Sequence, residues 1–159
     1  MECPSNSKVN IGLKVLNQRN DGYHNIYTVF QELDFGDSIT IEKTDSGCTI
    51  KSNVDWIPID ESNICHKAYS AIKIKYPGLG GVEIHIEKNV PIGSGLGGGS
   101  ANAAAVLKGI NELYGLGLSN SELENIGASV GADVPFFIRG RTQLCEGIGD
   151  KLTLLPSHI

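Results

Sequence analysis

The sequence predicts an α+β domain in which helices pack against a largely antiparallel sheet. Apolar and polar side chains alternate along residues 7–52, which is the period of strands. The apolar spacing becomes that of helices in residues 62–76 and 100–114, and alternation returns in residues 82–88. Because no repeat or linker divides the chain, we expect one domain over residues 1–159.

The first expected strand is SKVNIGLKVL, residues 7–16. Lys8 and Asn10 share one face of this strand, and the opposite face is apolar. The apolar face comprises Val9, Ile11, Leu13 and Val15. After the polar turn NQRNDG, residues 24–33 alternate again and predict the second strand.

The remaining strands follow turn signals. The letters DFGD at residues 34–37 predict a turn, after which residues 38–43 and 48–52 predict two further strands. The first third of the chain therefore predicts an antiparallel sheet. Residues 82–88 form another strand, and residues 134–155 close the chain with further strands.

Three helices are expected between these strands. The first covers residues 62–76 and ends before a Pro-Gly pair, and the second covers residues 100–114. Ser119 and Glu122 have the spacing of a capping box, which predicts the start of a short third helix ending near residue 130.

Composition limits the classes of binding partner and the cellular compartment that we expect for this chain. The net charge is −5 without a run of Lys and Arg, so we expect neither a nucleic-acid partner nor an anionic membrane surface. No apolar stretch approaches the roughly 20 residues of a membrane span, and the first residues do not resemble a secretion signal. The four cysteines and four histidines are scattered, which predicts free thiols, a cytoplasmic protein and no metal site.

Five glycines occupy seven positions within VPIGSGLGGGSANAAAVL, residues 90–107. Glycine accepts positive φ and lets backbone approach a ligand closely. A helix that follows such a loop adds free N–H groups and the positive end of its dipole, which favours a phosphate. A flexible turn or close helix packing is the alternative for an isolated glycine-rich string.

Three common phosphate loops do not fit these letters. A Walker A loop requires Lys before Ser100, where Gly99 stands. Gly93, Gly95 and Gly98 satisfy the dinucleotide pattern, but the acidic residue expected at a second parallel strand is missing. The protein-kinase pattern fails because the sequence has no HRD catalytic loop.

The segment PIGSGLGGGSANAA resembles the nucleotide-phosphate signature of the GHMP small-molecule kinases. Residues 7–39 and GASVGADVPFFIRG narrow the resemblance to the 4-diphosphocytidyl-2-C-methyl-D-erythritol kinase family of the non-mevalonate isoprenoid pathway. The resemblance implies a GHMP-kinase amino-terminal domain (ribosomal protein S5 domain 2-like). It also implies ATP-dependent phosphorylation of the 2-hydroxyl of that cytidine diphosphate-linked polyol, with Mg²⁺.

The resemblance assigns nucleotide binding mainly to the glycine loop. The implied ATP-binding residues are Gly93, Gly95, Leu96, Gly97, Gly98, Gly99, Ser100, Asn63 and Lys88. Asn63 stands at the start of a predicted helix, so a helix cap is an equally good interpretation of that residue.

Asp133 and Lys8 are the catalytic residues that the resemblance implies. Asp133, in GADVP at an expected helix-to-strand junction, would accept the proton of the substrate hydroxyl, and Lys8 would lie beside it. Without the resemblance, Asp133 would be interpreted as a cap or surface group and Lys8 as a solvated strand residue.

For the substrate, the resemblance implies that Asn10 binds the polyol, that Tyr23 stacks on the cytosine and that His24 forms hydrogen bonds with the edge of that base. Family members are roughly twice as long and have a second domain, which we expect to be absent here. Two alternatives therefore stay open: a non-catalytic or truncated nucleotide-binding module, and a GHMP kinase that acts on another small alcohol.

Overall fold

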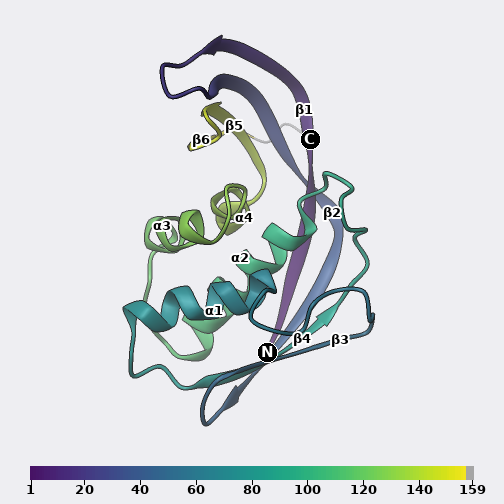
Figure 1. The fold of residues 1–159 in the computed structure, drawn as a ribbon, viewed down its shortest axis with the longest axis vertical. Helices are drawn as coiled ribbons and strands as arrows, with labels where there is room; N and C mark the ends of the chain where they lie inside the picture. Colours follow the sequence, from purple (N-terminus) through teal and green to yellow (C-terminus); the bar gives the residue numbers. More distant parts are fainter. Residues whose placement is uncertain (157–159) are drawn as a thin grey trace.

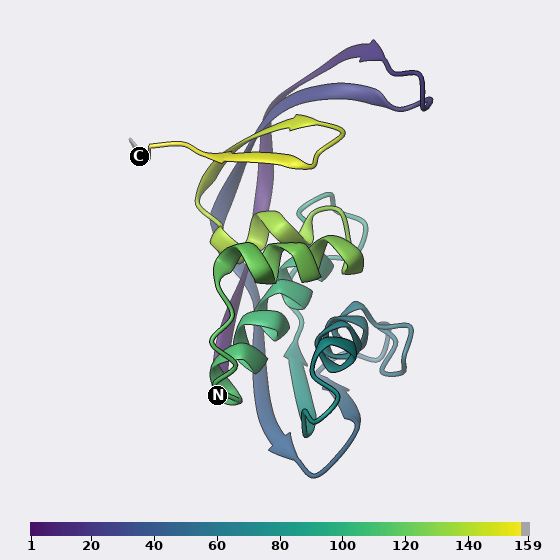
Figure 2. The same ribbon diagram turned by 90° about the vertical axis from the view of Figure 1, so that its left-hand side faces the viewer.

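The computed structural model describes residues 1–156, in which four helices cover one face of a six-stranded sheet (Figures 1 and 2). The strands are β1 (Glu2–Gln18), β2 (His24–Thr44), β3 (Cys48–Ser52), β4 (Gly81–Glu87), β5 (Thr142–Gly147) and β6 (Lys151–Leu154). The helices are α1 (Ile64–Lys75), α2 (Gly98–Leu113), α3 (Asn120–Val130) and α4 (Val134–Arg139). All strand pairs except β3 with β4 are antiparallel, which confirms the predicted fold class.

Strand β2 is the longest strand and organises the sheet. It pairs with β1 on one side and, on the other, with β5 through residues 26–31 and β4 through residues 38–44. The turn predicted at residues 34–37 is therefore wrong, because β2 passes straight through it. Gly36 permits a close approach to β1 there: a Cβ on Gly36 would lie 2.1 Å from the carbonyl oxygen of Ser5.

The antiparallel sheet predicted from the first third of the chain is only partly formed. Strand β3 does not pair with β2, because β4 lies between them and pairs with β3 in parallel. Short strands joined by a tight turn favour a hairpin. Here α1 carries the chain back so that β4 occupies the inner position, where Ile84 is fully buried.

The strand predicted from residue 134 begins instead as the helix α4. Pro135 lies in the first turn of this helix, where a missing N–H costs nothing, and Gly140 ends it. Val134, Phe136, Phe137 and Ile138 are buried. Asp133 therefore stands between two helices rather than at a helix-to-strand junction.

The far half of the β1–β2 hairpin forms an arm that extends beyond the helices and bends toward the side of the sheet that they cover (Figure 1). Its register shifts between Ile11 and Leu13 and between Val15 and Gln18, and such bulges bend a strand. Ile11, Leu13 and Val15 are each more than half exposed, so the apolar face of the first strand is not a core face along the arm.

Helix α2 forms the centre of the helical layer and packs on β1 and β2. Small residues permit this contact: a Cβ on Gly109 would lie 2.6 Å from Cδ1 of Ile41.

The four cysteines are free, and burial raises the pKa of the Cys48 and Cys145 thiols to about 11. These thiols are therefore neutral at physiological pH.

The capping box of α3 is confirmed. Ser119 Oγ accepts from the Glu122 N–H at 3.3 Å, and the Glu122 carboxylate accepts from the Ser119 N–H at 2.9 Å. We expect Ser119→Ala to lower the free energy of unfolding by about 1 kcal/mol. Urea denaturation measures this loss, and Ser121→Ala, which leaves the box intact, serves as the control; equal midpoints for the two variants would contradict it.

Candidate functional site

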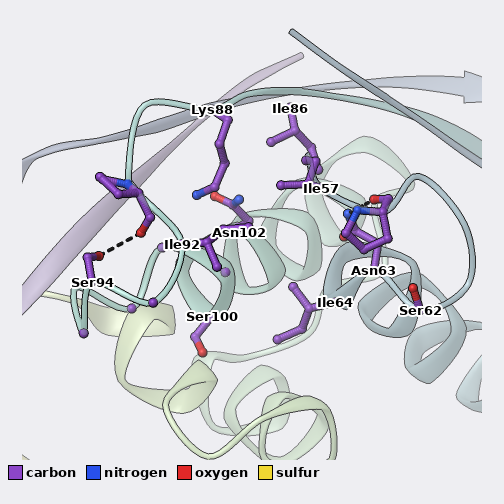
Figure 3. A pocket seen from close by; sticks show the side chains of 17 residues that line it. Ile57, Ser62, Asn63, Ile64, Ile86, Lys88, Ile92, Ser94, Ser100 and Asn102 are labelled. Carbon is purple, nitrogen blue, oxygen red and sulfur yellow. Dashed lines mark hydrogen bonds between the residues drawn. The ribbon is translucent and has the colours of Figure 1, made fainter. Parts of the chain in front are cut away.

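A cavity of about 400 Å³ lies where the glycine loop meets the beginnings of α1 and α2 (Figure 3). Eight of the nine residues that the family resemblance assigns to nucleotide binding line this cavity: Asn63, Lys88, Gly93, Gly95, Gly97, Gly98, Gly99 and Ser100. These residues come from three separate segments of the chain. The fold therefore brings the predicted set together, whereas Leu96 is not among the residues that line the cavity.

The glycine loop has the backbone that its letters predict. Gly93, Gly95 and Gly97 have φ of +71°, +76° and +73°, a region that other residues rarely adopt. Helix α2 begins at Gly98, two residues before the predicted start at Ser100. Gly97 is its N-cap and provides no side-chain acceptor, so the first N–H groups of the helix are left for a ligand.

Gly97 also joins the loop to the first strand. A Cβ on Gly97 would lie 2.7 Å from Cζ of Phe137 and 3.3 Å from Cε of Lys8. The neighbouring Leu96 carbonyl accepts from the Lys8 N–H at 2.9 Å. Leu96 therefore contributes its backbone to the site, and the loop lies directly against the lysine stem.

Lys8 and Asp133 form an ion pair across the fold, with 3.7 Å between Lys8 Nζ and an Asp133 carboxylate oxygen. The lysine side chain is 7% exposed and the aspartate side chain 40% exposed. Lys8 Nζ also donates to Asn10 Oδ1 at 2.6 Å and lies 4.6 Å from the centre of the Phe30 ring. These partners compensate the buried ammonium, which would otherwise be costly.

Asp133 stands at the N-cap of α4, yet its side chain makes no capping hydrogen bond. Its carboxylate is thus free to face Lys8 and solvent. Asn63 behaves differently. It caps α1 by accepting from the Cys65 N–H at 2.8 Å, and its amide group donates to the Pro58 carbonyl at 2.6 Å while bordering the cavity.

Sequence reasoning missed the apolar wall and one polar group of the cavity. Three isoleucines line the part of the cavity near Asn63: Ile57, Ile64 and Ile86. In the sequence, nothing distinguishes them from isoleucines of a hydrophobic core. Asn102 also lines the cavity and is buried, and it accepts from the Ser5 hydroxyl at 2.6 Å. An asparagine inside an alanine-rich helix was the available signal, because Asn is a poor helix former.

The structure does not bring Tyr23 and His24 to this cavity. Both are exposed where β2 begins, at the end of the curved arm (Figure 2). The Tyr23 N–H donates to Asp21 Oδ1 at 3.1 Å, so the segment is also the hairpin turn that its letters indicate.

Within residues 1–156, no group of three or more His, Cys, Asp or Glu side chains is placed to hold a metal ion. None of the helices in that range combines the length and apolar character of a membrane span.

Residues 63–141 match the family described as "GHMP kinases N terminal domain". The 4-diphosphocytidyl-2-C-methyl-D-erythritol kinase of Clostridium botulinum is 44% identical over 98% of this chain and 55% of the relative. The enzyme of the same name from Caldicellulosiruptor saccharolyticus is 49% identical over 95% of this chain and 52% of the relative. The chain thus spans about half the length of the curated relatives it matches.

A crystal structure of 4-(cytidine 5'-diphospho)-2C-methyl-D-erythritol kinase superposes with a TM-score of 0.87 at 37% identity. The superposition covers 98% of this chain and 55% of that one. The mevalonate kinase of Methanococcus jannaschii, with a TM-score of 0.67 at 17% identity, shares the fold.

Proposed function

This chain belongs to the GHMP kinase family, and on that premise we propose that it transfers the γ-phosphoryl group of ATP to the 2-hydroxyl of 4-diphosphocytidyl-2-C-methyl-D-erythritol. The observation that carries the proposal is the contact at Gly97. There the glycine loop lies against the Lys8 stem, so the phosphate cradle and the Lys8–Asp133 pair border one another. We take the substrate from the names of the relatives that are 44% and 49% identical to this chain.

In this proposal the ATP phosphates lie along the glycine loop. The free N–H groups at the start of α2 and the Lys88 ammonium would bind their oxygens. The adenine would lie at the opposite end, between the apolar wall and Asn63. That end suits a flat ring, because the isoleucine side chains there present apolar surface.

Asp133 would act as the general base. As the substrate hydroxyl oxygen forms its bond to the γ-phosphorus, the bond from that phosphorus to the β-bridging oxygen breaks and ADP leaves. The hydroxyl proton passes to the Asp133 carboxylate. Lys8, whose Nζ lies 3.7 Å from that carboxylate, helps to orient it and stabilises negative charge on the transferring group.

Magnesium is implied by the reaction class and would screen the charge of the phosphates. Since the described part of the chain holds no cluster of acidic residues for the ion, we expect phosphate oxygens and water to supply most of its ligands. The Ser100 hydroxyl is the protein oxygen we expect to contribute at the start of α2, where it lines the cavity.

We place the reaction in the cytoplasm, because four free cysteines are typical of a reducing compartment. The absence of nucleic-acid and membrane partners stays a prediction. One domain over residues 1–159 also stays a proposal, and residues 157–159 lie outside the described range.

Tyr23 would stack on the cytosine of the substrate while Asn10 and His24 bind the polyol and the base edge. We expect Tyr23→Ala to raise KM for the cytidine substrate about tenfold and to leave KM for ATP unchanged, because base stacking is worth about 1–3 kcal/mol. Tyr27→Ala, at a second exposed tyrosine that lies within β2, is the control. Equal effects of the two substitutions would remove Tyr23 from this role.

ADP release in the presence of the cytidine substrate tests the function directly. We expect release that depends on both substrates and is inhibited by CMP. Intact ATP binding without turnover would favour the nucleotide-binding module. Turnover of another alcohol without inhibition by CMP would favour a GHMP kinase of different specificity.

A further inference from the structure

Asp37 lies far from the glycine loop in the sequence but is bonded to the residues that lead into it. It stands inside β2, and its side chain is completely buried. One carboxylate oxygen accepts from the N–H groups of Asn89 at 2.6 Å and Val90 at 2.7 Å. The other oxygen accepts from Lys88 Nζ in a buried ion pair.

These bonds act on the nucleotide cavity. Lys88, directly after β4, lines the cavity and points toward the start of α2 (Figure 3). Its Nζ lies 3.0 Å from the position that a Cβ on Gly98 would take. Cγ1 of Val90 lies 2.9 Å from the same Cβ position on Gly98. Two of the three residues that Asp37 bonds, Lys88 and Val90, therefore meet the first residue of α2.

The chemistry of this arrangement is specific to a carboxylate. Asp37 accepts from two backbone N–H groups and supplies the countercharge of Lys88 at once, whereas an amide would turn its NH₂ group toward either the ammonium or the two N–H groups. A lysine has three donors, so Lys88 keeps donors for a ligand after bonding Asp37. Holding the ammonium in one place beforehand lowers the conformational cost of binding an anion.

We propose that Asp37 is a positioning residue for the nucleotide phosphates, because it holds the Lys88 ammonium and the backbone of Asn89 and Val90 in their binding arrangement. The inference rests on the proposed function, in which the glycine loop binds ATP. Asp37 itself is buried beneath this surface and acts only through the groups it bonds.

Binding of ATP and of adenosine to the Asp37→Asn variant tests the inference, with affinities measured by NMR titration. We expect ATP to bind at least about tenfold more weakly, as for the loss of a charge-assisted hydrogen bond. Adenosine, which has no phosphate, should bind as it does to the wild-type chain. An equal loss for both ligands, or no loss for ATP, would overturn the inference.

Glu83→Gln is the matched control. Glu83 lies in β4 and also forms an ion pair within the sheet, with Lys51 at 2.9 Å, but this pair is partly exposed to solvent and does not line the cavity. We expect its affinity for ATP to equal that of the wild type. A comparable loss in this control would show that an ion pair elsewhere on the sheet has the same effect and would overturn the assignment to Asp37.

Amide hydrogen exchange in the wild-type chain gives a second test that does not depend on how a variant folds. The N–H groups of Asn89 and Val90 should be protected before ATP is added, and ATP should add protection only at the start of α2. Fast exchange at Asn89 and Val90 in the free chain would refute the positioning role. A wild-type chain that binds no ATP would contradict the proposed function and this inference together.

Discussion

Asp133→Asn should lower kcat for ADP release by about 10²–10⁴-fold, the usual contribution of a general base. The substitution keeps the size of the side chain and removes the group that would accept the hydroxyl proton, together with its negative charge beside Lys8. The carboxylate makes no capping hydrogen bond, so α4 should keep its stability. Steady-state kinetics with the cytidine substrate measure the loss.

The affinity for ATP separates this role from a structural one. Asp133 does not line the nucleotide cavity, and removing its negative charge reduces the repulsion of phosphates. ATP should therefore bind to the variant at least as tightly as to the wild type. The matched control is Asp45→Asn, in the exposed turn after β2, which should turn over normally. An Asp133→Asn variant with wild-type kcat would leave the proposal without its base.

Gly97→Ala should affect both stability and nucleotide binding. A new Cβ would lie 2.7 Å from Phe137 and 3.3 Å from Lys8, and φ is +73°. Left-handed backbone costs an L-residue about 1–2 kcal/mol and crowding of a packed site a further 1–3 kcal/mol. We therefore expect a loss of about 2–5 kcal/mol in the free energy of unfolding, together with weaker ATP binding, because the loop must move.

Gly117→Ala isolates the backbone part of this effect. Gly117 also has positive φ, +69°, but open space surrounds the position of its Cβ. It should lose only the backbone cost of about 1–2 kcal/mol and keep its affinity for ATP. Chemical denaturation and ATP titration of both variants provide the comparison. Equal stability losses would show that Gly97 is needed only for its conformation and not for the close approach to Lys8.

Several features of the site could be predicted from the sequence because they depend on local chemistry. Three glycines with positive φ ahead of an alanine-rich helix are a local requirement, and the structure confirms each of those φ values. The capping box at Ser119 is also local and is confirmed. The pairing of Lys8 with Asp133 spans the chain, and only the family resemblance indicated it.

Other features depended on contacts between distant segments. The letters at residues 34–37 favour a turn, yet β2 stays extended because it pairs with β1 on both sides of a register shift, at Gly36 and at Glu32. The hydrogen bonds of that pairing outweigh a weak local preference. Residues 134–139 favour a strand by composition, but they form a helix that begins at Val134, and Phe137 of this helix packs against Gly97 of the loop.

The sequence by itself determined the fold class, the phosphate loop and its helix, because backbone conformation and amphipathic period depend on neighbouring residues. Only the tertiary structure decided that Asp37 is a buried partner of Lys88 and that the apolar face of the arm is exposed. Burial and ion pairing depend on which distant segments meet. The identity of one residue, such as Asp, a type common in turns, does not show which distant segment that residue will contact.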